Sequence, residues 1–170
     1  VDQRSAFQHI LIFDTPQNGR VLVLDGNVQL TERDECAYSE MLTHVPMMDH
    51  GAVERVMIVG GGDGAIAEEV LKYRSVKEVE LVDIDGEVIR LARKHFEVPD
   101  DPRYRTHAAD GRLFVERSGE RKWDMIILDA FRGVFVPFHL KTREYYELLR
   151  SHMRDDAVVG TPAVHMLSFT

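Results

Sequence analysis

The sequence lacks the features that mark several classes of protein. Its single cysteine, Cys36, excludes an internal disulfide framework and is consistent with a reducing compartment, so we expect a cytoplasmic protein. No apolar run approaches the roughly 20 residues that cross a bilayer, and the first residues carry no signal-peptide pattern. With 21 basic against 29 acidic side chains, the net charge of −8 argues against nucleic-acid binding and suits a cationic small molecule or an ordinary solubilising surface.

Motifs for metal binding and for nucleophilic catalysis are also missing. The eight histidines are scattered, with no H-E-x-x-H motif and no paired cysteines, so the sequence predicts no metal site. Each histidine is expected on the surface or in an interface. There is no G-x-S-x-G elbow, and Cys36 is interpreted as a packing residue of a helix because no base is evident beside it.

The 170 residues that are present suffice for one sizeable core, and two patterns follow each other along the chain. Residues 7–31 consist of short apolar bursts separated by turns at 16–19 and 25–26, which predicts three antiparallel strands. A helix should follow Thr31. Along it, Tyr38, Met41, Leu42 and Val45 recur at helical spacing. Pro46 is expected to end this run near His50 and Gly51.

From residue 54 onward, apolar strands alternate with amphipathic helices. Strands are expected at residues 56–59, 79–84, 104–108, 125–128 and 157–159, with helices between them, the last at 141–153. This alternation predicts an α/β fold with a doubly wound, mainly parallel sheet. A small antiparallel β segment would precede it.

Four aspartates lie at the ends of the first four parallel strands: Asp63, Asp83, Asp110 and Asp129. Ligands of open α/β sheets bind beyond these carboxyl ends, so the four side chains are expected around one cleft. The glycine-rich run GGGDG at 60–64 follows the first strand, where it would let a ligand approach the backbone and the start of the next helix.

Each aspartate has a binding interpretation and a local one. Asp83 would hold ribose hydroxyls, and Asp85 is the better candidate for the helix cap. Asp110 could accept a hydrogen bond from an adenine amino group or cap a short helix, and the pattern favours neither. Asp63 would attract an ammonium group and repel a carboxylate, unless it caps the helix after the loop. Asp129 is expected to be a half-shielded site acid or a strand-end turn residue.

Beyond these patterns, the sequence resembles the spermidine synthase family of polyamine aminopropyltransferases. The resemblance rests on the runs LDG at 24–26, QLTERDE at 29–35, EMLTHVP at 40–46 and GGGDG at 60–64, and it extends from about Phe7 to Arg150. It implies an N-terminal oligomerisation segment at 1–50 (β-hairpins plus a helix) and a methyltransferase-like (Rossmann-type) nucleoside-binding domain at 51–170. It also implies a homo-oligomer, a dimer or tetramer.

The same resemblance implies roles for ten residues. Asp129 would be the catalytic acid, Asp63 would bind the aminopropyl amine, and Gln29 and Tyr38 would lie near the reacting groups. The donor nucleoside, decarboxylated S-adenosylmethionine, would contact Gln8, Gly61, Gly62, Asp83, Asp110 and Gly111. The implied reaction passes the aminopropyl group to putrescine or a related diamine and leaves methylthioadenosine. The donor is a co-substrate that is already activated, so no metal or prosthetic group is required.

Three departures from the family pattern concern the amine acceptor. Arg132 replaces the second acid of the family's Asp-x-x-Asp, and Ser39 stands where the family often has His or Gln. The chain ends at Thr170, whereas the family continues through two more strands that complete the acceptor pocket. Two alternatives therefore stay open: a methyltransferase-like enzyme that uses intact S-adenosylmethionine, and a truncated, non-catalytic homologue that binds the nucleoside.

Overall fold

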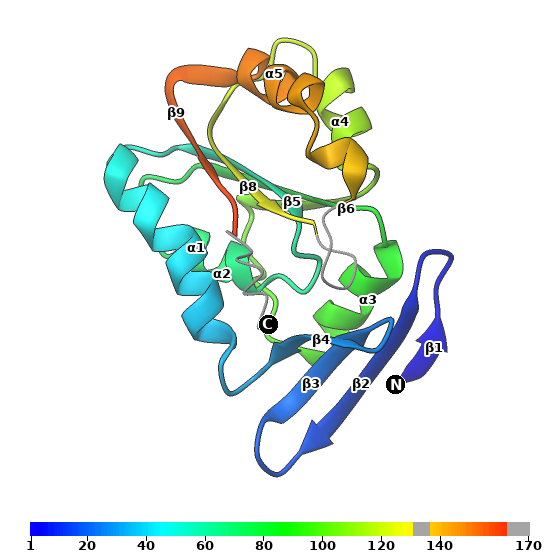
Figure 1. Cartoon of the computed structure of the whole chain (residues 1–170). Helices are drawn as coiled ribbons and strands as arrows, with labels where there is room; N and C mark the ends of the chain where they lie inside the picture. The colour runs from blue at the N-terminus through cyan, green and yellow to red at the C-terminus, as the bar shows by residue number, and fades with distance from the viewer. Residues whose placement is uncertain (131–136, 163–170) are drawn as a thin grey trace, which may run out of the picture.

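The computed structural model describes residues 1–130 and 137–162, which form two sheets and the helices around them (Figure 1). The N-terminal sheet is antiparallel, and its strands follow in chain order: β1 (Asp2–Arg4), β2 (His9–Thr15), β3 (Gly19–Leu24) and β4 (Asn27–Thr31). The expected strands are β2 to β4. The expectation of three strands missed β1, whose short polar sequence Asp-Gln-Arg has no apolar pattern but pairs with β2.

The turn between β3 and β4 has the backbone that its sequence predicts. Asp25 and Gly26 both adopt positive φ, +49° and +80°, as a two-residue hairpin turn with a primed geometry requires. Aspartate tolerates this region better than most residues and glycine adopts it without a steric cost. The turn therefore fixes the register of the two strands.

The larger sheet has five parallel strands in the order β7-β6-β5-β8-β9. This confirms the predicted α/β fold. Its strands are β5 (Arg55–Gly60), β6 (Glu78–Asp83), β7 (Tyr104–Ala108), β8 (Trp123–Asp129) and β9 (Met153–Gly160). The helical segments are α1 (Glu35–His50), α2 (Ala65–Leu71), α3 (Gly86–His95), α4 (Gly111–Arg117), the 3₁₀ turn η1 (Phe138–Leu140) and α5 (Arg143–Ser151). Met153, expected on the last helix, begins β9 instead.

Both faces of this sheet are covered, because its central strands β5 and β8 carry continuous apolar runs. Val56 and Ile58 of β5 pack with residues of α1, α2 and α3, whereas Met57 and Val59 pack with α4 and α5. Side chains alternate between the faces of a strand, so a continuous apolar run needs helices on both sides. Each fully buried Val, Ile or Met contributes about 1.5–3 kcal/mol, which makes this central layer the main source of stability.

The N-terminal sheet packs on the larger domain through one of its faces. Ile10, Ile12 and Leu22 are buried against Ala65 of α2 and Val88 and Leu91 of α3. In Figure 1 this sheet lies below the carboxyl ends of β5 and β8. It therefore forms one wall of the region where α/β sheets bind ligands. The boundary at residue 50 stays a prediction, since α1 itself packs on α2 and β9.

Helix α1 does not pack through the apolar residues that recur at helical spacing. Its buried residues are Ser39, Leu42, Thr43 and Met47, whereas Tyr38, Met41 and Val45 are exposed. Small Ser39 and Thr43 let the helix approach its neighbours closely, which the count of apolar residues did not reveal. The helix continues past Pro46 to His50 and stops at Gly51, with φ of +77°, which is where its end was predicted.

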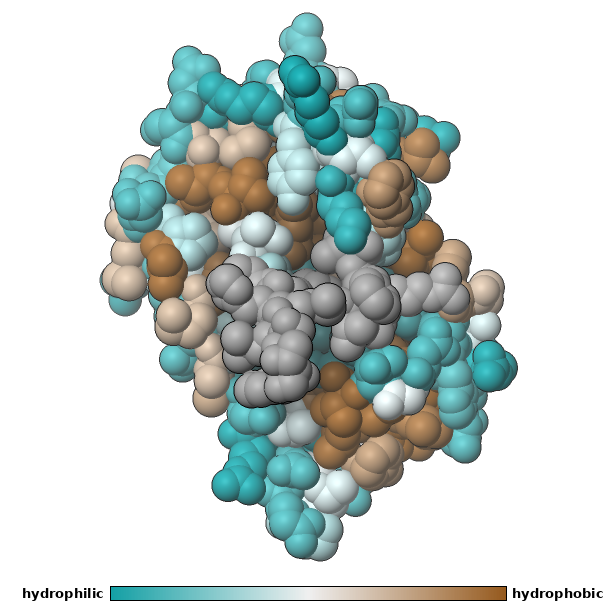
Figure 2. All heavy atoms as spheres, in the orientation of Figure 1, coloured by the Kyte–Doolittle hydropathy of each residue, from teal (hydrophilic) through white to brown (hydrophobic). Residues whose placement is uncertain are grey.

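Two further surface features accompany this orientation. Figure 2 shows apolar side chains gathered over β9 and α1 and over the N-terminal sheet. Cys36 is exposed on α1, so its expected packing role is wrong. Within residues 1–130 and 137–162, no helix combines the length and the apolar character needed to cross a membrane.

Candidate active site

A cavity of about 1190 Å³ opens at the carboxyl ends of the central strands, between the larger sheet, α1 and the N-terminal sheet. All ten residues to which the sequence assigned a role line this one cavity: Gln8, Gln29, Tyr38, Gly61, Gly62, Asp63, Asp83, Asp110, Gly111 and Asp129. The four aspartates lie at or just after the ends of β5, β6, β7 and β8, as predicted. The individual roles of these residues stay predictions.

The glycine-rich loop brings the end of β5 against two of these aspartates. A Cβ atom on Gly60 would lie 2.2 Å from the backbone oxygen of Asp129, and φ of Gly60 is +85°. A Cβ on Gly62 would lie 2.8 Å from Oδ2 of Asp83. Both positions therefore require glycine, because any side chain there would push an acid of the site aside.

Asp83 links this loop to the second strand. Its Oδ2 accepts a hydrogen bond from the backbone N–H of Gly62 at 3.1 Å, and its Oδ1 accepts one from Asp85 at 2.8 Å. Asp85 itself caps α3 through the N–H of Glu87, as predicted. Burial raises the pKa of Asp83 to about 6 although both hydrogen bonds oppose the shift. A ligand with hydroxyl donors or a positive charge would restore the ionised form.

Asp63 lies in the loop itself. Its surroundings are compatible with both predictions made for it, the binding of an ammonium group and the capping of the next helix. Its Oδ1 accepts a hydrogen bond from the N–H of Ala65 at 3.0 Å, so it does contact the start of α2. Burial raises the pKa of its carboxyl, and the nearby charge of Glu35 adds to the increase. A buried carboxylate beside other acids is stabilised when a cation replaces the missing solvent.

Asp129 ends β8 and is hydrogen-bonded by a residue from a distant helix. The hydroxyl of Tyr38 donates to Oδ1 of Asp129, across 91 residues of sequence. Burial and the charges of Asp63 and Asp83 raise the pKa of Asp129 to about 7, against the hydrogen bond from Tyr38, which lowers it. A carboxyl group that titrates near neutral pH can accept a proton from a substrate, which is the property a general base needs.

Asp110 caps α4 and also contacts a histidine. Its Oδ1 accepts the N–H of Leu113 at 3.0 Å, and its Oδ2 lies 3.0 Å from Nε2 of His139. The capping interpretation is thus confirmed, while the two oxygens keep lone pairs for a ligand. Behind this residue, a Cβ on Gly111 would lie 2.5 Å from Cγ1 of Val59, so α4 begins in close contact with β5.

The amide groups of the two glutamines donate hydrogen bonds within the protein, one to a distant residue and one to a near neighbour. Nε2 of Gln8 donates to Oδ2 of Asp85 at 2.9 Å, and Nε2 of Gln29 donates to the backbone oxygen of Asn27 at 3.4 Å. Gln8 therefore joins the N-terminal sheet to the cap of α3 at the edge of the cavity. This contact depends on how the two sheets dock, and no sequence pattern indicated it.

Several lining residues were missed by sequence reasoning. They are Asp34, Glu35, Phe138, His139 and Leu140, and His139 had been placed on the surface or in an interface. The position of Ser39 had been noted, and its buried side chain also lines the cavity. Of the described residues that line it, six are acids and none is Lys or Arg. The electrostatic potential of such a cleft favours a cationic ligand.

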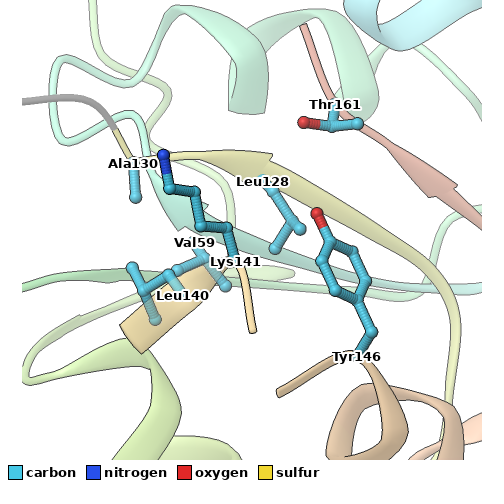
Figure 3. A pocket seen from close by; sticks show the side chains of 7 residues that line it. All are labelled: Val59, Leu128, Ala130, Leu140, Lys141, Tyr146 and Thr161. Carbon is cyan, nitrogen blue, oxygen red and sulfur yellow. The ribbon is translucent and has the colours of Figure 1, made fainter. Parts of the chain in front are cut away.

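A smaller cavity of about 40 Å³ lies beside the end of β8, a volume close to that of one water molecule. Figure 3 shows the side chain of Lys141 running past Leu140 with its ammonium group beside Ala130, and the Tyr146 hydroxyl turned toward Thr161. Arg132, where the family pattern has an acid, lies outside the described residues.

In the part of the chain that the structure describes, no group of three or more His, Cys, Asp or Glu side chains could hold a metal ion. The four aspartates at the strand ends are therefore not arranged as a metal-ligand cluster.

Comparisons with known proteins agree with this architecture. Residues 35–168 match the spermine/spermidine synthase domain, and residues 2–32 match the spermidine synthase tetramerisation domain. A spermine synthase of Arabidopsis thaliana is 38% identical over 167 residues, 96% of this chain and 46% of that protein. A polyamine aminopropyltransferase of Hamiltonella defensa is 42% identical over 148 residues, 84% of this chain and 51% of the relative.

Solved structures give the same result. A spermidine synthase in complex with the transition-state analogue AdoDATO has a TM-score of 0.89 and 38% identity, covering 95% of this chain and 56% of that one. The spermidine synthase of Thermotoga maritima has a TM-score of 0.84, again at 38% identity and over 95% of this chain and 55% of that one. The chain thus spans about half the length of these relatives. By sequence and by fold, the chain belongs to the spermine/spermidine synthase family.

Proposed function

We propose that the protein transfers the aminopropyl group of decarboxylated S-adenosylmethionine to putrescine or a related diamine, giving spermidine and methylthioadenosine. The donor carries a sulfonium and an ammonium group and no carboxylate. The cavity offers six acids and no Lys or Arg among its described lining residues, which is the charge pattern that such a ligand needs. Family membership supports the same reaction. A cytoplasmic location is proposed with it, on the single cysteine of the sequence.

The donor would lie along the carboxyl ends of the strands. Asp83 would accept hydrogen bonds from ribose hydroxyls, next to the free backbone of the glycine loop. Asp110 would face the base, and Asp63 would pair with the ammonium group of the aminopropyl chain. The observation that carries the proposal is Asp63: a half-buried carboxyl group whose pKa is raised by the loss of solvent, inside the loop where an intact donor would place its own carboxylate.

The chemistry is a displacement at the carbon next to the sulfonium. The lone pair of the acceptor nitrogen forms the new C–N bond while the C–S bond breaks and its electrons return to sulfur, which leaves a neutral thioether. The nitrogen then carries one proton too many. Asp129, whose pKa is about 7, would accept or relay this proton, and Tyr38 would hold its carboxylate in place.

The test compares the decarboxylated donor with intact S-adenosylmethionine by calorimetry, followed by a product assay with putrescine. We expect tighter binding of the decarboxylated form and formation of spermidine. Asp63→Asn should weaken the decarboxylated donor about tenfold or more and leave methylthioadenosine nearly unchanged, because that product lacks the ammonium group. Asp100→Asn, at an exposed position outside the cavity lining, is the matched control.

Two results would decide against the proposal. Equal or tighter binding of intact S-adenosylmethionine would favour a methyltransferase-like enzyme. Donor binding without product from any diamine would favour a non-catalytic nucleoside-binding protein.

The N-terminal sheet is proposed to join copies of the chain into a homo-oligomer. Residues 2–32 match a domain named for tetramerisation. Ile12 of β2 is buried against the larger domain, so its neighbour Phe13 points to the opposite face, where 47% of it is exposed. An exposed phenylalanine on a free sheet face is typical of a protein–protein contact.

A further inference from the structure

His139 lies at the end of the cavity where the base of the donor is proposed to bind. It belongs to η1, and its Nε2 is 3.0 Å from Oδ2 of Asp110. Both side chains line the main cavity together with Phe138. The contact joins two segments that are 29 residues apart, and the sequence patterns that identified the four aspartates gave no sign of it.

Three contacts fix the position of this histidine. Leu140, the next residue, is buried in the core beneath α4 and α5. Nη1 of Arg112 donates to the backbone oxygen of His139 at 3.3 Å, which ties η1 to α4. Asp110 is itself held by the N–H of Leu113. The packing of Leu140, the hydrogen bond to the backbone oxygen of His139 and the contact at Nε2 therefore hold the imidazole ring in place.

The contact with Asp110 sets the tautomer of a neutral imidazole ring that lies beside an ionised carboxylate. An ionised carboxylate can only accept hydrogen bonds, so Nε2 must be the donor. In the neutral ring Nδ1 is then an acceptor, and no described residue donates a hydrogen bond to it. The end of the cavity thus presents two kinds of acceptor side by side: the carboxylate of Asp110 and Nδ1 of His139.

We propose that His139 is a specificity-determining residue for the nucleobase, which selects a 6-aminopurine and rejects a 6-oxopurine. This inference rests on the proposed function, since it takes the ligand to be a purine nucleoside with its base at Asp110. A 6-amino group has two N–H donors to match the two acceptors. A 6-oxo group would place a third acceptor against them, and unpaired buried acceptors are costly.

The test measures the ratio of two affinities by calorimetry: methylthioadenosine against methylthioinosine, whose base has a 6-oxo group in place of the 6-amino group and a proton on N1. We expect the protein to bind methylthioadenosine at least about tenfold more tightly. His139→Phe keeps a ring but offers no hydrogen bond, and should reduce the ratio to about threefold or less. His139→Gln places an amide N–H and a carbonyl oxygen near the positions of Nε2 and Nδ1, and should preserve the ratio.

Two more variants separate recognition from folding. His139→Lys keeps a donor for Asp110 but has no acceptor, so it should lose the discrimination between the two nucleosides. It serves as the test if His139→Phe does not fold. His9→Phe is the matched control, because His9 also contacts an aspartate, Asp2 at 2.7 Å, but does not line the cavity. Its ratio should equal that of the unchanged protein.

An unchanged ratio in folded His139→Phe or His139→Lys would overturn the inference, and so would an unchanged protein that binds both nucleosides equally. Failure of the proposed function is a separate result, because the binding ratio needs neither an amine nor turnover. Discrimination that depends on His139 without any spermidine formation would leave the inference standing and remove the aminopropyl transfer. Failure to bind either nucleoside would overturn both.

Discussion

Tyr38 of α1 donates a hydrogen bond to Asp129 at the end of β8. Through this contact a helix from the N-terminal part of the chain controls the carboxyl group that the reaction is proposed to use. The hydrogen bond stabilises the ionised form, whereas burial and the charges of Asp63 and Asp83 favour the protonated form. The pKa of about 7 reflects the balance of these effects.

Tyr38→Phe should shift the pH dependence of activity. Without the hydrogen bond the pKa of Asp129 rises above about 7, so the acid limb of the kcat/KM profile should move about half a unit to one unit higher, with a loss of about 2- to 5-fold at pH 7. Tyr73→Phe is the control, since the hydroxyl of Tyr73 contacts His44 instead. Superimposable acid limbs for the two variants would contradict the role of Tyr38.

Binding of the decarboxylated donor should strengthen with pH. Asp83 and Asp129, with pKa values of about 6 and about 7, are increasingly protonated below these values and then attract a cation less. Affinity should rise about tenfold or more between pH 5 and pH 8, with proton release on binding near pH 6.5. Calorimetry in buffers of different ionisation enthalpy measures the protons. Methylthioadenosine, which is neutral, should show a much smaller pH dependence, and equal dependence for both ligands would contradict the charge argument.

Asp129→Asn should stabilise the ligand-free protein at high pH while removing activity. The folded-state pKa of about 7 exceeds the ordinary value of 3.8, so the folded state holds a proton that the unfolded chain releases first. The contribution of Asp129 to the free energy of unfolding is complete below about pH 4 and is lost as the pH rises through about 7. The variant should therefore be about 1–2 kcal/mol more stable at pH 8 and unchanged at pH 4, with activity reduced about 100-fold or more.

Denaturant unfolding at the two pH values measures this difference. The same excess stability at pH 4 and pH 8 would show that the effect does not come from ionisation.

Gly62→Ala should weaken donor binding more than it affects folding. The added Cβ would lie 2.8 Å from Oδ2 of Asp83 and displace the carboxylate proposed to hold the ribose. We expect a loss of donor affinity of about tenfold or more. The control is Gly119→Ala, where φ of +66° also costs stability but the Cβ has no atom within 4 Å. Equal affinity losses in both variants would indicate a general effect of destabilisation.

Phe13→Asp should dissociate the proposed oligomer. A charge in place of an exposed aromatic on the outer face of β2 would be buried without a partner in any interface there. Light scattering should report a smaller particle, with the monomer fold retained in circular dichroism. The control is Arg33→Ala, an exposed residue just after β4. An unchanged mass for Phe13→Asp would place the contact elsewhere.

The order of the elements and the edge that carries the site could be predicted from the sequence. The apolar strands could be buried only in a sheet with both faces covered, and the loops after them brought Asp63, Asp83, Asp110 and Asp129 to one edge. The glycine loop was equally clear, because a tight turn after a buried strand requires those residues. These features follow from local periodicity and chain order.

The tertiary structure decided which of these residues touch and which faces are covered. Helical spacing grouped Tyr38, Met41 and Val45 but could not tell that α1 packs through Ser39 and Thr43, which leaves the hydroxyl of Tyr38 free to reach Asp129. The contact of His139 with Asp110 likewise arises from the way η1 docks on α4. A sequence pattern records the periodicity of one element, whereas a hydrogen bond between distant elements depends on how their surfaces fit together, and that fit exists only in the folded molecule.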